Sequence, residues 1–131
     1  MKYLSLAQAF VLGELVTGIK AHDLVNISRS ELLDSALHAS QAGFEDEDFY
    51  PDFFMKAAVL CSRIALNHPL PDGNKRLAWI SLVQFCDLNG YELHVPFNDA
   101  VSTMLSVAAG QFPEVELAEW IRGRAMTGEM P

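Results

Sequence analysis

The sequence has few cations, few cysteines and no long apolar run, and each shortage excludes a class of protein. Its 131 residues carry 9 Lys and Arg against 17 Asp and Glu, a formal net charge of −8 that argues against direct nucleic-acid binding. No apolar run approaches the roughly 18 residues of a transmembrane helix, and no charged N-terminal segment precedes a long apolar one. We therefore expect a cytoplasmic protein that does not bind a membrane.

The two cysteines, Cys61 and Cys86, both lie within apolar helical patterns. This position predicts buried, reduced thiols rather than a disulfide or a metal-binding pair. Half of the residues are apolar, enough to build one continuous core. We predict a single domain over residues 1–125, followed by a frayed C-terminal tail over residues 126–131.

Apolar residues recur at helical spacing along most of the chain. Ser5 with Gln8 predicts a capping box, Ser28 with Glu31 a second cap, and Asn98 or Asp99 a third. Helices are expected over residues 5–20, 28–37, 52–67, 77–88, 98–108 and 114–124. The segment 77–88 is apolar nearly all round and should be the buried central helix.

Three shorter segments show weaker patterns. Residues 21–27 have no clear period. Residues 91–95 alternate briefly and could be a strand, but they are too few for a sheet of their own. Residues 41–51 place aromatic side chains around an acidic run, which predicts a loop or a short hairpin. Charge runs are usually solvated connections, and the alternative is a flap beside the functional site.

The chemistry is concentrated in nine consecutive residues between two apolar helical patterns: His68, Pro69, Leu70, Pro71, Asp72, Gly73, Asn74, Lys75 and Arg76. The prolines disfavour a helix or strand, and Asp72 to Asn74 indicate a loop that enters a helix N-terminus. Backbone N–H groups there lack intrahelical partners, and Lys75 and Arg76 add full positive charges. The run therefore predicts an anion site.

Each of these residues also has a purely structural explanation. His68 could favour a helix C-terminus, Asp72 could be an N-cap with Gly73 as a turn residue, and Asn74 could hold the loop through the backbone. Lys75 and Arg76 could be solvated surface charges. Together, however, the residues predict a phosphate site with a base. Asp72 would hold Mg²⁺, the amides and Arg76 would contact phosphate, and His68 would accept a proton.

The run resembles the Fic/Doc family signature, H-P-F-x-D/E-G-N-K/G-R, and the chain is similar to the death-on-curing (Doc) branch. The likeness continues through residues 32–37, 50–51, 88–91 and the closing helices. It implies a compact all-α Fic fold, with a small β-hairpin flap near residues 41–51, and transfer of part of ATP to a protein hydroxyl. The implied roles are general base for His68, Mg²⁺ ligand for Asp72, anion hole and positioning for Gly73 and Asn74, and phosphate contacts for Lys75 and Arg76.

Departures from the signature bear on the reaction. Leu70 replaces the usual Phe, a change expected to affect packing more than catalysis. Lys75 stands where adenylylating members commonly have a second glycine, and residues 77–79 lack a further arginine that those members often carry. The resemblance then favours γ-phosphate transfer, with elongation factor Tu as the implied target. Gly73 is typical of adenylylating members, so AMP transfer stays open, as does a binding module without catalysis.

The resemblance also bears on regulation. Self-inhibiting members carry an S/T-x-x-x-E-G/N helix, and no glutamate of this sequence has Ser or Thr four residues before it. We therefore expect restraint by a separate partner. The resemblance implies a Phd-like antitoxin whose disordered segment folds as a helix on an apolar groove, and a protein substrate that is a translation factor.

Overall fold

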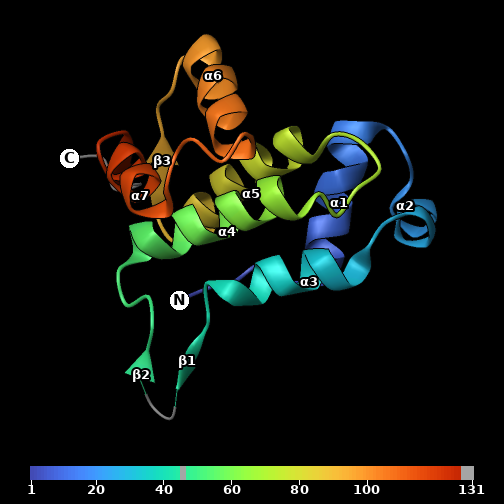
Figure 1. Ribbon diagram of the computed structural model, residues 1–131, viewed down its shortest axis with the longest axis horizontal. Helices are drawn as coiled ribbons and strands as arrows, with labels where there is room; N and C mark the ends of the chain where they lie inside the picture. Colours follow the sequence, from blue (N-terminus) through green and yellow to red (C-terminus); the bar gives the residue numbers. More distant parts are fainter. Residues whose placement is uncertain (45–46, 128–131) are drawn as a thin grey trace.

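The computed structural model describes residues 1–44 and 47–127, and this part of the chain is mainly helical (Figure 1). The helices are α1 (Leu6–Thr17), α2 (Ala21–Ile27), α3 (Ser30–Ala39), α4 (Phe53–Asn67), α5 (Asn74–Leu88), α6 (Phe97–Ala108) and α7 (Glu114–Arg122). The strands are β1 (Gly43–Phe44), β2 (Glu47–Asp48), β3 (Tyr91–Leu93) and β4 (Ala125–Thr127). The prediction of an all-α fold with a small hairpin is confirmed. No helix in the described ranges has the length and apolar character needed to cross a membrane.

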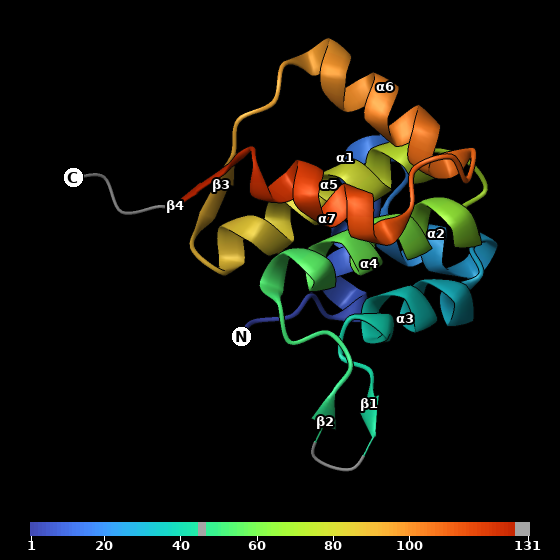
Figure 2. The same ribbon diagram turned by 60° about the vertical axis from the view of Figure 1, so that its left-hand side comes forward.

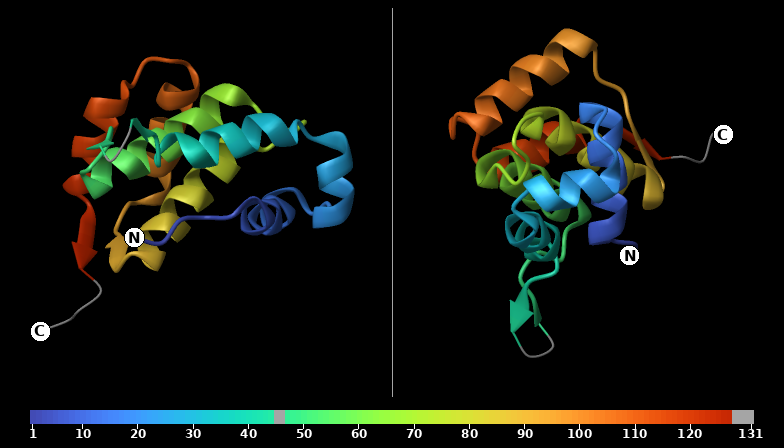
Figure 3. Two further views of the ribbon diagram at one scale, coloured as in Figure 1. Left: turned by 90° about the horizontal axis from the view of Figure 1, so that it is seen from below. Right: turned by 90° about the vertical axis from the view of Figure 1, so that its right-hand side faces the viewer.

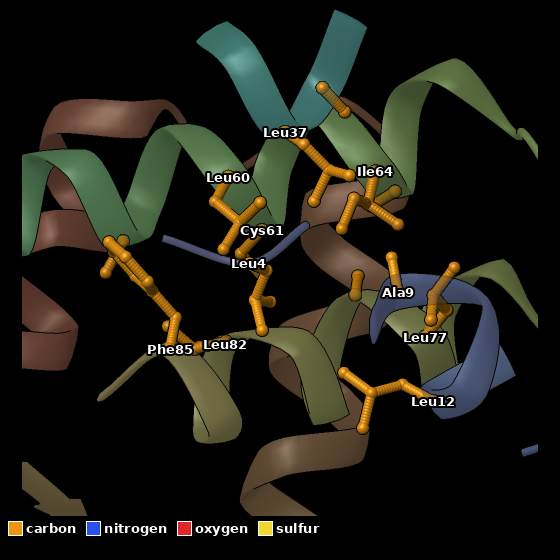
Figure 4. Close-up of a cluster of buried hydrophobic side chains, with 14 of the residues drawn as sticks. Leu4, Ala9, Leu12, Leu37, Leu60, Cys61, Ile64, Leu77, Leu82 and Phe85 are labelled. Atoms are coloured by element: carbon orange, nitrogen blue, oxygen red, sulfur yellow. The ribbon is translucent and has the colours of Figure 1, made fainter. Parts of the chain in front are cut away.

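The antiparallel helices α4 and α5 form the centre of the core. Figure 4 shows Leu60, Cys61 and Ile64 of α4 in one cluster with Leu82 and Phe85 of α5. Side chains from the N-terminal segment and α1 complete this cluster (Leu4, Ala9 and Leu12). Helix α5, whose first turn belongs to the predicted site, is therefore held in place by packing against α4, α1 and the N-terminal segment.

Both cysteines are buried free thiols, as predicted. Burial raises the pKa of Cys61 and of Cys86 to about 12. Cys61 Sγ also lies 3.5 Å from Met104 Sδ, which places it against α6. The thiols therefore contribute to the core as apolar side chains.

One of the three predicted caps is present. Ser5 Oγ accepts from the Gln8 N–H at 3.1 Å, and Gln8 Oε1 accepts from the Ser5 N–H at 2.8 Å, which confirms the capping box. The second and third predicted caps are wrong, because α3 begins after Arg29 and α6 after Pro96, and neither start has a side-chain cap. At the start of α3 the Arg29 N–H instead makes a tertiary contact, because it donates to the Pro69 carbonyl.

Strands β3 and β4 form an antiparallel pair that the sequence did not predict. Tyr91 lies opposite Thr127 and Leu93 opposite Ala125. The predicted frayed tail is therefore corrected for Met126 and Thr127, which are strand residues, whereas residues 128–131 lie outside the described part. Pairing with a strand more than 30 residues away leaves no local pattern, and Figure 2 shows β4 returning beside β3.

Strands β1 and β2 form a hairpin that projects away from the helices (Figures 1 and 3). The hairpin precedes the N-terminus of α4, whereas His68 follows its C-terminus. Helix α4 has 15 residues, a length of about 22 Å. The hairpin is therefore not a flap beside the predicted site, and the expectation of a connection exposed to solvent fits better.

Candidate functional site

The six predicted site residues lie together in the loop that joins α4 to α5 and in the first turn of α5. With Pro71 they line one cavity of about 300 Å³: His68, Asp72, Gly73, Asn74, Lys75 and Arg76. Helix α4 delivers the imidazole from its C-terminal end, and α5 contributes the cations from its first turn. The packing of these two helices against each other therefore fixes the two sides of the site.

His68 has a backbone conformation that is unusual for a residue other than glycine. Its φ of 50° and ψ of 56° are left-handed, and within the described residues it is the one non-glycine with positive φ. This conformation ends α4 and redirects the chain. Pro69 and Leu70 then turn into the core, while the His68 side chain stays exposed. The imidazole is thus available to a substrate in solution.

The loop is tied to helix α3 by two hydrogen bonds. The Arg29 N–H donates to the Pro69 carbonyl at 2.8 Å, and Asn67 Nδ2 donates to the Leu32 carbonyl at 3.1 Å. Sequence reasoning missed Arg29 and Asn67, because both act through contacts that are distant along the chain. They hold the residue before His68 and the residue after it.

Asn74 braces the loop from the other side. Its Oδ1 accepts from the Leu70 N–H at 2.8 Å, and its Nδ2 donates to the Leu70 carbonyl at 2.9 Å. This is the structural role considered for Asn74 in the sequence. It is compatible with a positioning role in the site, because it sets the shape of the loop that carries His68 and Asp72.

Gly73 begins α5 and fits closely against α1. It is the N-cap residue, with φ 85°, and its carbonyl accepts from the Leu77 N–H. The N–H groups of residues 74–76 therefore precede the intrahelical ladder and are open to an anion. A Cβ at this position would lie 3.3 Å from Thr17 Cγ2. The position thus favours glycine both by its backbone conformation and by its close approach to α1.

Asp72 does not cap α5, so that structural alternative is wrong. Gly73 occupies the N-cap position, and the exposed Asp72 carboxylate accepts no hydrogen bond from the described residues. Mg²⁺ is commonly held by one or two carboxylates together with substrate phosphates. An unpaired carboxylate beside an anion site fits that donor set.

Lys75 and Arg76 carry charge that the protein does not neutralise. Both are exposed, and neither belongs to an ion pair within residues 1–44 and 47–127. By contrast, Arg63 lies 3.3 Å from Glu114, and Arg122 lies 2.6 Å from Asp52. In a protein with a net charge of −8, two unpaired cations at a helix N-terminus create a local positive charge, the kind of environment that favours an anion.

A second cavity, an apolar groove of about 580 Å³, adjoins the first and shares Lys75 and Arg76 with it. Its other lining residues come from α1, α5 and α6: Leu15, Val16, Trp79, Ile80, Val83, Phe97, Ala100, Val101, Met104 and Leu105. The family resemblance implied an apolar groove, but sequence reasoning did not locate it or name its residues. A signal was present in α6, where Phe97, Val101 and Leu105 form an apolar stripe beside the buried face.

The chain is similar to known proteins. Residues 5–86 match the model of the Fic/DOC family. The protein called Toxin Doc of Mycolicibacterium smegmatis (strain ATCC 700084 / mc(2)155) is 43% identical over 67 residues, which cover 51% of this chain and 52% of that protein. The match thus spans about half the length of this curated relative. The family match covers more than half of the chain, including the whole loop from His68 to Arg76. The chain therefore belongs to the Fic/DOC family.

Proposed function

We propose that this protein is a Doc-like toxin that transfers the γ-phosphate of ATP to a hydroxyl group of a protein. One observation carries the proposal: a base, an unpaired carboxylate and two unpaired cations line a single cavity at the N-terminus of α5. The name of the relative, Toxin Doc, supports the biological role. By resemblance, the target is a translation factor, elongation factor Tu.

His68 is the general base in this proposal. As the hydroxyl oxygen attacks the γ-phosphorus, its proton passes to a ring nitrogen of His68. The bond between the γ-phosphorus and the bridging oxygen of ATP then breaks, and ADP leaves. The left-handed turn that ends α4 keeps the imidazole on the exposed side of the loop, where a protein substrate can reach it.

The start of α5 holds the phosphates. The phosphates of ATP would lie beside the backbone N–H groups of residues 74–76 and the side chains of Lys75 and Arg76. These groups would stabilise the negative charge that shifts among the phosphate oxygens during transfer. Asp72 would hold Mg²⁺, which when bound offsets charge on the phosphates. Asn74 keeps this geometry through its two bonds to Leu70.

Lys75 decides which part of ATP is transferred. Its long cationic side chain lines the cavity at a position where adenylylating members commonly have glycine. It therefore occupies space that one polyphosphate pose would need, which favours γ-phosphate transfer. AMP transfer is the second candidate, because Gly73 matches the adenylylating members. A nucleotide-binding or protein-binding module without catalysis is the third.

Labelled ATP separates these candidates. The purified protein is incubated with a bacterial lysate, Mg²⁺ and ATP labelled at the γ- or the α-phosphate, with His68→Ala as the control. We expect γ-label on a protein, no α-label, and loss of transfer in the control. Transfer of the α-label would establish an adenylyltransferase instead. Absence of both labels would favour the binding module.

We also propose that a Phd-like antitoxin segment folds as an amphipathic helix in the apolar groove. The groove lies between α1 and α6 and is strongly exposed, with Phe97 80% and Leu15 69% accessible. Because it shares Lys75 and Arg76 with the phosphate cavity, a helix that fills it would abut the nucleotide. Restraint and catalysis would then act at neighbouring surfaces.

Growth assays test this partner. Expression of the protein alone should arrest growth, and co-expression of the adjacent small reading frame should restore it. Phe97→Asp should keep the arrest but lose the rescue. Val115→Asp on α7, an equally apolar position that is 66% exposed outside the groove, should still be rescued. Equal rescue of both variants would exclude the groove, and harmless expression of active protein alone would show that the restraint lies elsewhere.

A further inference from the structure

Lys56 is a lysine buried within the first half of α4. Its side chain is 3% exposed, and Nζ donates to the Ser40 carbonyl at 3.0 Å and to Asp48 Oδ2 at 2.6 Å. Nζ also lies 5.7 Å from the centre of the Tyr3 ring. A buried ammonium is costly unless it is paired and hydrogen-bonded. These three contacts are therefore what allows Lys56 to stay inside.

Those contacts come from three separate segments. Tyr3 belongs to the N-terminal segment, Ser40 follows α3, and Asp48 lies in strand β2 of the projecting hairpin. Burial by itself lowers the pKa of Lys56, but the hydrogen bond with Asp48 and the nearby Tyr3 outweigh it and leave the pKa raised. The side chain of Lys56 thus remains charged and joins all three segments to α4.

The hairpin has few other connections to the domain. Its strands have two residues each, and it is closed by the Phe49 N–H, which donates to the Ala42 carbonyl at 2.9 Å. Isolated two-stranded hairpins are marginally stable in water. Among the side-chain hydrogen bonds and ion pairs of the described residues, Lys56 to Asp48 is the one that joins β1 or β2 to another element.

We propose that Lys56 fixes the β1–β2 hairpin on the body of the domain, and that the hairpin separates from it and loses its own pairing when this contact is lost. The inference goes beyond the proposed function and does not depend on it. His68 lies at the opposite end of α4, so separation of the hairpin leaves the phosphate cavity in place. Lys56 is therefore a positioning residue for the hairpin and not for the loop.

Amide hydrogen exchange, followed by NMR on the full chain, tests this. In Lys56→Met, the exchange rate at the Phe49 amide should rise about tenfold or more, the change expected when a partly buried ion pair is lost. The amides of α5 should keep their protection. Asp48→Ala should have the same effect from the hairpin side, which keeps the test valid if the Lys56 variant folds poorly. Phe49 is the reporter in both, because the Tyr50 amide bonds Asp48 itself.

Arg122→Met is the matched control. Arg122 forms an ion pair of the same 2.6 Å length at the same end of α4, with Asp52, but its side chain is 44% exposed. Its loss should leave exchange at Phe49 unchanged. Unchanged exchange in both hairpin variants would overturn the proposal, as would an equal rise in the Arg122 variant.

Discussion

The side chain of Asn74 pairs with the backbone of Leu70 through two hydrogen bonds, one accepted at 2.8 Å and one donated at 2.9 Å. The amide thus satisfies a backbone N–H and a carbonyl in a loop that two prolines keep out of regular structure. Because the side chain of Leu70 is buried, this pairing also anchors the loop to the core. The shape of the site therefore depends on Asn74, whose side-chain amide is used in hydrogen bonds to the Leu70 backbone.

Replacing Asn74 should destabilise the protein as well as inactivate it. Asn74→Ala leaves the Leu70 N–H and carbonyl without partners, at a cost of about 1–3 kcal/mol in the free energy of unfolding. Denaturant unfolding measures the loss. Asn26→Ala, at an exposed position on α2, should change it by no more than about 0.5 kcal/mol. Equal stability of the two variants would contradict the bracing role.

Gly73→Ala should cost more stability than Gly18→Ala. Both glycines have positive φ, 85° and 77°, so each substitution carries a backbone penalty of roughly 1–2 kcal/mol. Only at Gly73 would the new Cβ meet Thr17 Cγ2, at 3.3 Å, whereas no atom lies within 4 Å at Gly18. Adding Thr17→Ser, which removes that methyl group, should recover part of the difference. Thermal unfolding of the three variants and the unmodified protein measures these losses, and equal losses at both glycines would contradict the close fit.

His68→Ala should reduce transfer of the γ-phosphate by about 10²–10⁴-fold, the usual contribution of a general base. His68→Asn is the better-folded companion, because asparagine tolerates the left-handed conformation found here. His22→Ala, an exposed histidine on α2, should retain full transfer. Rates with labelled ATP compare the three, and normal turnover in either His68 variant would remove the residue from the mechanism.

Asp72→Asn should lose metal-dependent activity with little change in stability. Asp72 is exposed and is not the N-cap, so the free energy of unfolding should change by no more than about 0.5 kcal/mol. Asp52→Ala gives the opposite pattern, because Asp52 accepts from the Met55 N–H at the start of α4 and its loss should cost about 1 kcal/mol. Activity titrated with Mg²⁺, beside denaturant unfolding, distinguishes the roles. Full Mg²⁺-dependent activity in Asp72→Asn would exclude it as a ligand.

The buried thiols should make the protein sensitive to alkali. In the folded state the pKa of Cys61 and Cys86 is about 12, whereas thiols of an unfolded chain ionise near pH 8.5. Their contribution to stability is therefore present below about pH 8.5 and is lost as the pH rises towards 12. Unfolding measured against pH should show this decline, and a variant with Cys61→Ala and Cys86→Ala should show less of it. An identical decline in both proteins would assign it to other groups.

The sequence predicted the helical fold because most helices carry a local apolar period, and the capping box of α1 lies within four residues. The site was also predictable, since His68 to Arg76 are contiguous and necessarily lie near one another. What the motif could not reveal was the conformation. The sequence did not predict the left-handed turn at His68 or the choice of Gly73 over Asp72 as N-cap, and Gly73 lies close against Thr17 of α1, a contact distant along the chain.

The missed elements depend on contacts between distant segments. Helix α2 has no clear apolar period, and its first amide donates to Glu14 Oε1 at 2.8 Å, a partner seven residues earlier. Strand β4 exists through pairing with β3. The apolar groove implied by the resemblance could not be located for a similar reason, because whether Phe97 is buried or exposed depends on how far α6 lies from α1.

The turn after α5 has a consequence for the connectivity of the chain. Asn89 bonds both the N–H and the carbonyl of Lys2, and Tyr91, two residues on, pairs with Thr127. The first and last described segments are therefore both bound to the turn that follows α5, so they lie near each other in the folded protein. A circular permutant that joins these ends through a short linker, and opens the chain at the exposed turn around Gly18, should therefore keep the same core.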